Sequence, residues 1–96
     1  MVHAFLVASV LDREREIENI VVADAERRRG FGKQLLDAFL SLSRREAAKM
    51  IFLEVRESNL AARKLYEKCG FVENGRRRRY YQPPEEDAIL YQRFLP

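Results

Sequence analysis

The chain has 96 residues and a mass of 11.3 kDa, and its 47% hydrophobic and 34% charged residues suit one domain with one apolar core. It contains no apolar run near the length of about 20 residues that a membrane span needs, no basic segment typical of a secretory signal, and a single cysteine, Cys69, which excludes an internal disulfide. These features predict a soluble cytoplasmic protein.

The net charge is +3, and arginine outnumbers lysine 14 to 4. The excess lies in two clusters, Arg27–Arg29 and Arg76–Arg79. Clustered arginine suits phosphate, carboxylate or nucleic acid, because the planar guanidinium pairs with oxyanions. A solvated basic surface is an equally good interpretation of composition alone.

In chain order, the residue pattern predicts five strands and two helices. We expect strands over 4–11 and 17–23 around a charged turn at 12–16, a helix over 32–48, a strand over 50–56, a helix over 60–69, and strands over 71–81 and 87–94 around a turn at 82–86. The order β-β-α-β-α-β-β predicts an α/β (α+β) fold, with a mixed sheet covered by helices. The crossover from 17–23 to 50–56 should be parallel and right-handed.

A glycine-containing loop, Gly30-Phe31-Gly32-Lys33, lies where a strand leads into a helix. Free backbone N–H groups and the helix dipole make such a place suitable for an anion, and Arg28 and Lys33 add positive charge. Alternatively, the glycines serve only the geometry of a tight turn. The spacing matches neither the dinucleotide nor the Walker phosphate motif.

The glycine-containing loop and three segments after it resemble a known family. Arg27-x-x-Gly30-x-Gly32 after a strand resembles the acyl-CoA pyrophosphate loop of the GNAT acetyltransferases. Three further segments are similar to the ribosomal-protein-alanine N-acetyltransferase (RimI-like) branch: Leu53-Glu54-Val55-Arg56-x-Ser58-Asn59-x-x-Ala62-x-x-Leu65-Tyr66-x-x-x-Gly70-Phe71, Arg78-Arg79-Tyr80-Tyr81 and Glu86-Asp87-Ala88. The resemblance implies acetyl-CoA as cosubstrate and a protein or peptide N-terminus of the alanine type as acceptor. No metal is expected, because the sequence has no cluster of His and Cys ligands.

The resemblance also implies a site for the cosubstrate. The pyrophosphate would lie on the backbone of Arg28, Arg29, Gly30, Phe31, Gly32 and Lys33. The pantetheine arm would run beside Ile20, Val21 and Val22, in a gap where that strand splays from strand 50–56, and an N–H around Val22 would polarise the thioester. Asn59 would hydrogen-bond CoA, a role compatible with capping the following helix.

Two residues take catalytic roles in the resemblance. Glu54, mid-strand on the face opposite Leu53 and Val55, would be the general base, and partial burial would suit that role. The alternative for Glu54 is an ion pair with a nearby arginine such as Arg56. Tyr66 would protonate the leaving CoA thiolate, and its alternative is a core tyrosine.

Two other features admit more than one interpretation. Cys69 could act as a nucleophile, but a buried structural thiol is favoured because no histidine lies near it in sequence. Arg76–Arg79 with Tyr80 and Tyr81 fits a solvated edge strand, contact with peptide or CoA, or, least favoured, nucleic acid.

The chain departs from the family in length. The family's first strand, the two helices after it and its second strand have no counterpart, so residues 1–96 are expected to form a single truncated acetyl-CoA-binding domain. Strand 4–11 should then expose an apolar edge, which predicts a homodimer. The leading function is N-acetyl transfer. The alternatives are a catalytically weak CoA-binding module and a small basic nucleic-acid-binding protein.

Overall fold

The computed structural model describes residues 4–22 and 30–96. Within them the elements are β1 (Ala4–Leu11), β2 (Glu14–Val22), α1 (Phe31–Arg45), β3 (Met50–Arg56), α2 (Leu60–Lys68), β4 (Val72–Tyr81) and β5 (Glu86–Phe94). This confirms the predicted element order. No helix in the described part of the chain is long and apolar enough to cross a membrane.

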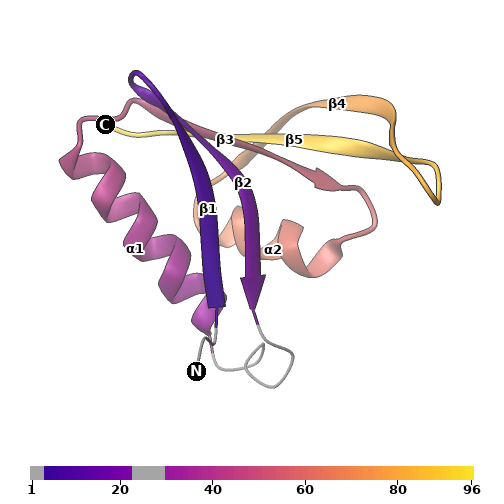
Figure 1. Ribbon diagram of the computed structural model, residues 1–96, viewed down its shortest axis with the longest axis horizontal. Coiled ribbons are helices and arrows are strands. Elements are labelled where there is room, and N and C mark those ends of the chain that lie inside the picture. The colour runs from indigo at the N-terminus through magenta and orange to yellow at the C-terminus, as the bar shows by residue number, and fades with distance from the viewer. Residues whose placement is uncertain (1–3, 23–29) are drawn as a thin grey trace.

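The strands form one mixed sheet in the order β1-β2-β3-β5-β4 (Figure 1). β1 with β2, β3 with β5, and β4 with β5 are antiparallel pairs, whereas β2 and β3 run parallel, as the crossover through α1 predicts. Both helices lie on the same side of this sheet in Figure 1.

β2 and β3 pair only at their beginnings. The ladder joins Glu14–Ile17 to Met50–Leu53 and then stops, although β2 continues to Val22 and β3 to Arg56. The two strands diverge beyond this point (Figure 1). The predicted splay between them is therefore confirmed, and it opens a gap between the C-terminal halves of the two strands.

The first hairpin differs from the prediction. β2 begins at Glu14 rather than at residue 17, so the turn shortens to Asp12 and Arg13, with Asp12 at φ 57. Arg15, expected in a charged turn, is buried in the strand. Burial is tolerated because its guanidinium donates to the carbonyls of Asp12 and Glu14 at 2.8 and 2.9 Å and pairs with Glu46 at 3.3 Å.

α1 spans 31–45 instead of the predicted 32–48. The helix ends early because Ala47 takes φ 58, and the N–H of Ala48 bonds back to the carbonyl of Ser43 at 2.9 Å. The strand over 50–56 has the predicted bounds, and the later elements agree with the prediction to within one residue.

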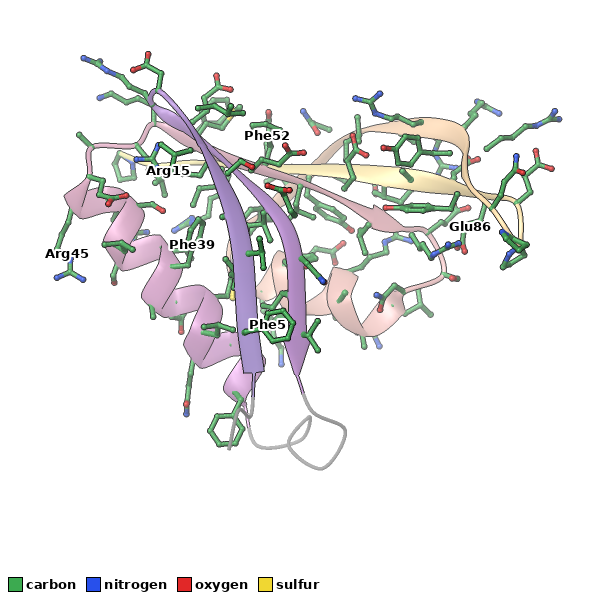
Figure 2. The ribbon with its side chains drawn as sticks, viewed as in Figure 1. Phe5, Arg15, Phe39, Arg45, Phe52 and Glu86 are labelled. Atoms are coloured by element: carbon green, nitrogen blue, oxygen red, sulfur yellow. The ribbon has the colours of Figure 1, made fainter. Side chains whose placement is uncertain are left out.

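The core lies between the helices and one face of the sheet. Along β3, Ile51, Leu53 and Val55 are buried and the residues between them are half-buried, which confirms the predicted alternation. The same buried cluster contains Ile17, Leu36, Leu40, Ala48, Tyr66, Cys69, Phe71, Ile89, Tyr91 and Leu95. Phe52 lies on the opposite face, and Phe39 lies on the helix side (Figure 2).

We predict that Leu36→Ala lowers the free energy of unfolding by about 2–5 kcal/mol, because it leaves a cavity at a fully buried position. Leu42→Ala, on the same helix but 45% exposed, should cost less than about 1 kcal/mol. Urea denaturation of both variants measures the difference. Equal losses would contradict the assignment of the α1 face that packs on the sheet.

Candidate active site

The N-terminus of α1 offers backbone donors. Gly30, the N-cap residue, has φ 76, and, apart from its chain neighbours, no atom of the described residues lies within 4 Å of the place where a Cβ would sit. The first helical bond runs from Gln34 N–H to the Gly30 carbonyl at 3.0 Å, so the amides of Gly32 and Lys33 precede it at the positive end of the helix. An anion can therefore approach this backbone closely.

Of the two side chains that were expected to add charge to this anion site, Lys33 is described and it already has a carboxylate partner. The Lys33 ammonium lies 2.7 Å from the Asp37 carboxylate, and this hydrogen bond raises the pKa of Lys33. Its charge is therefore shared with Asp37. Arg28 and Arg29 lie outside the described residues.

The gap between β2 and β3 brings other predicted residues together. Ile20 and Val21 belong to the part of β2 beyond its last pair with β3, and Ile20 packs on the core while Val21 is 40% exposed. The backbone of Val22 ends the same strand. Across the gap, Glu54 is the first residue of β3 after the last paired position, Leu53. The carboxylate therefore belongs to the residue at which the gap opens.

Glu54 is held by an arginine, but not by the one expected. Its carboxylate pairs with Arg77 Nε at 2.8 Å, and its side chain is 20% exposed. Arg56 instead pairs with Glu86 at 3.2 Å and lies over the Tyr81 ring at 4.3 Å from the centroid. In the sheet register, Glu54 is paired with Leu90 of β5 and Arg56 with Ala88. On the other side of β5, Ala88 is paired with Arg77 of β4. Arg77 thus reaches Glu54 diagonally across β5 on one face of the sheet.

Tyr66 is embedded in the core at the sheet side of α2. It is 5% exposed, and its ring lies 5.8 Å from that of Phe71 and 6.2 Å from that of Tyr91. Burial, with a smaller effect from Tyr81, raises the pKa of Tyr66 to about 12. The phenol therefore stays protonated at neutral pH, as a proton donor must.

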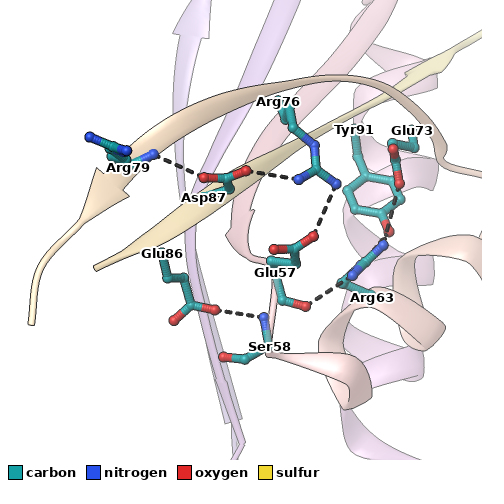
Figure 3. Close-up of polar contacts among 9 residues, drawn as sticks. All are labelled: Glu57, Ser58, Arg63, Glu73, Arg76, Arg79, Glu86, Asp87 and Tyr91. Atoms are coloured by element: carbon teal, nitrogen blue, oxygen red, sulfur yellow. Dashed lines mark hydrogen bonds and ion pairs between the residues drawn. The ribbon is translucent and has the colours of Figure 1, made fainter. Parts of the chain in front are cut away.

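A polar network fixes the start of α2 against the β4–β5 hairpin (Figure 3). Asn59 caps α2 by accepting from Ala62 N–H at 3.2 Å, which confirms the capping role. Arg76 bridges Glu57 at 3.0 Å and Asp87 at 2.8 Å. The remaining links are Ser58 N–H to Glu86 at 2.7 Å, Arg63 to Tyr91 Oη at 3.1 Å and Arg63 to Glu73 at 3.3 Å.

Carboxylates neutralise most of the second arginine cluster. Arg76 and Arg77 are paired as described, and Arg79 lies 3.1 Å from Glu85. Hydrogen bonds from the Arg79 backbone and from Arg76 lower the pKa of Asp87. Three of the four arginines in this cluster are therefore already paired within the protein.

Cys69 is buried, as favoured from the sequence. Burial raises the pKa of its thiol, and the nearby Asp37 carboxylate, 3.9 Å from Sγ, acts in the same direction. Both effects disfavour the thiolate that a nucleophile would need. Among the residues that the structure describes, no group of three or more His, Cys, Asp or Glu side chains could hold a metal ion.

The sequence singled out Arg76–Arg79, Tyr80 and Tyr81 as a candidate contact segment, but it did not predict that Arg77 and Tyr81 meet Glu54 and Arg56. Tyr80 and Tyr81 pack edge-to-face with centroids 5.1 Å apart, and Arg77 lies 5.6 Å from the Tyr80 centroid. The Arg-Arg-Tyr-Tyr run was the available signal. Its register against β5 shifts twice, so the cross-strand contacts could not be counted from the sequence.

Comparison with known proteins gives a consistent result. Residues 2–71 match the acetyltransferase (GNAT) family. The [ribosomal protein bS18]-alanine N-acetyltransferase of Haemophilus ducreyi is 33% identical over 96% of this chain and 66% of the relative, and that of Escherichia coli K12 is 38% identical over 91% and 60%.

Solved structures agree. The crystal structure of the Escherichia coli ribosomal-protein-S18-alanine N-acetyltransferase superposes with a TM-score of 0.88 and 37% identity, covering 94% of this chain and 59% of that one. Ard1 from Thermoplasma volcanium superposes with a TM-score of 0.90 and 36% identity, covering 97% and 63%. The chain thus spans about 60% of the length of most of these proteins.

The raised pKa of Tyr66 predicts how stability changes at alkaline pH. The unfolded chain loses this proton near pH 10 and the folded protein near pH 12, so the contribution is complete below pH 10 and is lost as the pH rises to 12. Tyr66→Phe should make the fall in unfolding free energy between these values shallower, by up to about 2–3 kcal/mol. Denaturation curves at pH 9 to 12 measure it. The matched control is Tyr80→Phe at a 53% exposed position, and an identical fall in both variants would refute the prediction.

Proposed function

Because this chain belongs to the acetyltransferase (GNAT) family, we propose that it transfers an acetyl group from acetyl-CoA to the amine of a protein or peptide N-terminus. The relatives named above act on an alanine of ribosomal protein bS18, which supports an alanine-type acceptor. The observation that carries the proposal is the gap beyond Ile17 and Leu53, with Glu54 at its beginning.

The described residues suit acetyl-CoA. The pyrophosphate would accept hydrogen bonds from backbone amides at the start of α1, where Gly30 leaves room for close approach. The pantetheine arm would enter the gap beside Ile20, Val21 and Val22, whose strand no longer pairs with β3 there. Asn59 would reach CoA from the start of α2 while still capping the helix.

Proton transfers would be divided between two residues. Glu54 would take a proton from the acceptor's ammonium group, directly or through one water. The free amine would attack the thioester carbonyl, so that a C–N bond forms as the C–S bond breaks, and the nitrogen would release its second proton to water as the amide forms. Tyr66, kept protonated by burial, would give its proton to the departing thiolate.

The reaction would proceed directly within a ternary complex. A ping-pong route needs a nucleophile that carries the acetyl group, and the thiol available for it in the described part of the chain is Cys69. Its burial and raised pKa argue against that role.

Turnover of acetyl-CoA with a peptide bearing a free N-terminal alanine tests the assignment. Glu54→Gln and Tyr66→Phe should each lower kcat/KM by about 100-fold or more, because each removes a proton-transfer group. Glu16→Gln, which makes the same change on the same face of the neighbouring strand, should leave kcat/KM within about twofold. Unchanged turnover in the first two variants would show that the mechanism is wrong.

Thermal stabilisation by acetyl-CoA separates the alternatives. Stabilisation without turnover of any amine would identify a CoA-binding module. This alternative is worth testing because the chain spans about 60% of the length of its relative from Escherichia coli. No stabilisation, with salt-dependent binding of RNA or DNA, would favour the nucleic-acid interpretation.

We also propose that two copies of the 96-residue chain associate through β1. β1 is an edge strand, and Phe5, Val7 and Leu11 expose 45%, 46% and 49% of their surface (Figure 2 labels Phe5). Antiparallel pairing of two identical edges follows a two-fold axis and satisfies the unpaired backbone groups.

Light scattering at micromolar concentration should give twice the 11.3 kDa chain mass. Val7→Lys should shift the protein to monomer, because it places a charge in the interface. Val72→Lys, at a 65% exposed position on the other edge strand, should leave the mass unchanged. A stable wild-type monomer would rule out this association.

A further inference from the structure

A continuous chain of contacts connects Glu54 to the β4–β5 hairpin. Its order is Glu54, Arg77, Tyr80, Tyr81, Arg56 and Glu86, with an ion pair at each end and three ring contacts between them. Glu54, Arg56 and Arg77 lie on the sheet face away from the helices, since their strand neighbours in register share that face. The carboxylate proposed as the base is therefore already occupied by a cation.

The two arginines in this chain are held differently. Arg56 is 36% exposed, pairs with Glu86 and lies 4.3 Å from the Tyr81 centroid. Arg77 is 58% exposed, and its ring contact is longer, at 5.6 Å from the Tyr80 centroid. Its ion pair is the shorter of the two, but the guanidinium of Arg77 is the more open to solvent and to competition from another cation.

We propose that Arg77 is a positioning residue that holds the Glu54 carboxylate until the acceptor binds, and that the acceptor's ammonium group then takes the place of Arg77. The proposal rests on the proposed function, because it takes Glu54 as the residue that receives the proton. A base must lie within about 3 Å of the proton it removes or of one bridging water. Arg77 Nε occupies such a position now, at 2.8 Å from Glu54. Two adjacent cations repel, so the arriving ammonium displaces the guanidinium.

Because of this exchange, the acceptor site should bind a peptide with a charged N-terminus in preference to one with an uncharged N-terminus. An acceptor with a cationic N-terminus forms an ion pair with Glu54 in place of the lost Glu54–Arg77 pair, whereas an acceptor with an uncharged N-terminus forms none. Without Arg77 there is no pair to break, so cationic acceptors bind more tightly. The gain should be about two- to fivefold, the size expected for a partly exposed ion pair.

The test compares two peptides by isothermal titration in the presence of CoA, which prevents turnover. One peptide begins with a free alanine, and the other is the same peptide acetylated at its N-terminus. Arg77→Gln should tighten binding of the free peptide two- to fivefold relative to the acetylated one. Arg77→Lys retains the cation and should stay near wild type. Arg78→Gln is the control, because it removes the same charge from a neighbouring residue whose charge acts on Asp87. It should change the affinities for the free and the acetylated peptide by the same factor.

NMR supplies a readout that a merely structural role would not move. Glu54→Gln should shift the Nε–H resonance of Arg77, and adding the free peptide to wild type should shift it in the same direction. An unchanged affinity ratio in Arg77→Gln, an unmoved resonance, or no binding of the free peptide would each overturn the exchange. Turnover is measured separately. If Arg77→Gln changes the affinity ratio and the peptide shifts the Arg77 resonance, but the wild-type protein transfers no acetyl group, the enzyme assignment alone is refuted.

Discussion

The short parallel ladder between β2 and β3 is the constraint on which the rest of the structure depends. Its four residues on each strand keep the sheet continuous, and its end at Ile17 and Leu53 opens the gap. β2 runs along this gap to Val22, and the described chain resumes at Gly30, which leads into α1. Backbone donors, an open strand edge and the carboxylate of Glu54 therefore belong to neighbouring elements of the fold.

Ion pairs within the fold account for part of the arginine content. Five arginines pair with a carboxylate that is distant from them in the sequence: Arg15, Arg56, Arg63, Arg76 and Arg77. Exposed pairs of this kind add little stability individually. The effect of Arg56, Arg63, Arg76 and Arg77 is geometric, because their pairs hold the β4–β5 hairpin against β3 and the start of α2. Figure 3 shows the contacts of Arg63 and Arg76.

The two faces of the sheet have different roles. The helix side is packed with apolar residues and also holds Tyr66, whose burial keeps its proton. The other side carries half-buried and exposed residues, among them Phe52 and Glu54, and it has no helix over it in the described chain (Figure 1). The proposed base and acid thus sit in environments of opposite polarity, which is how one fold can accept a proton at one residue and donate one at another.

The sequence alone determined the element order, the alternation along β3, the cap at Asn59 and the burial of Cys69, because periodicity and capping are local properties. The family resemblance led to the splay and to Glu54 and Tyr66. Only the tertiary structure decided that Arg15 is buried, that Arg77 rather than Arg56 holds Glu54, and that Lys33 pairs with Asp37. The physical reason is that an ion pair depends on which side chains register and bulges bring within reach, and a charge is buried only where distant carbonyls and carboxylates satisfy it.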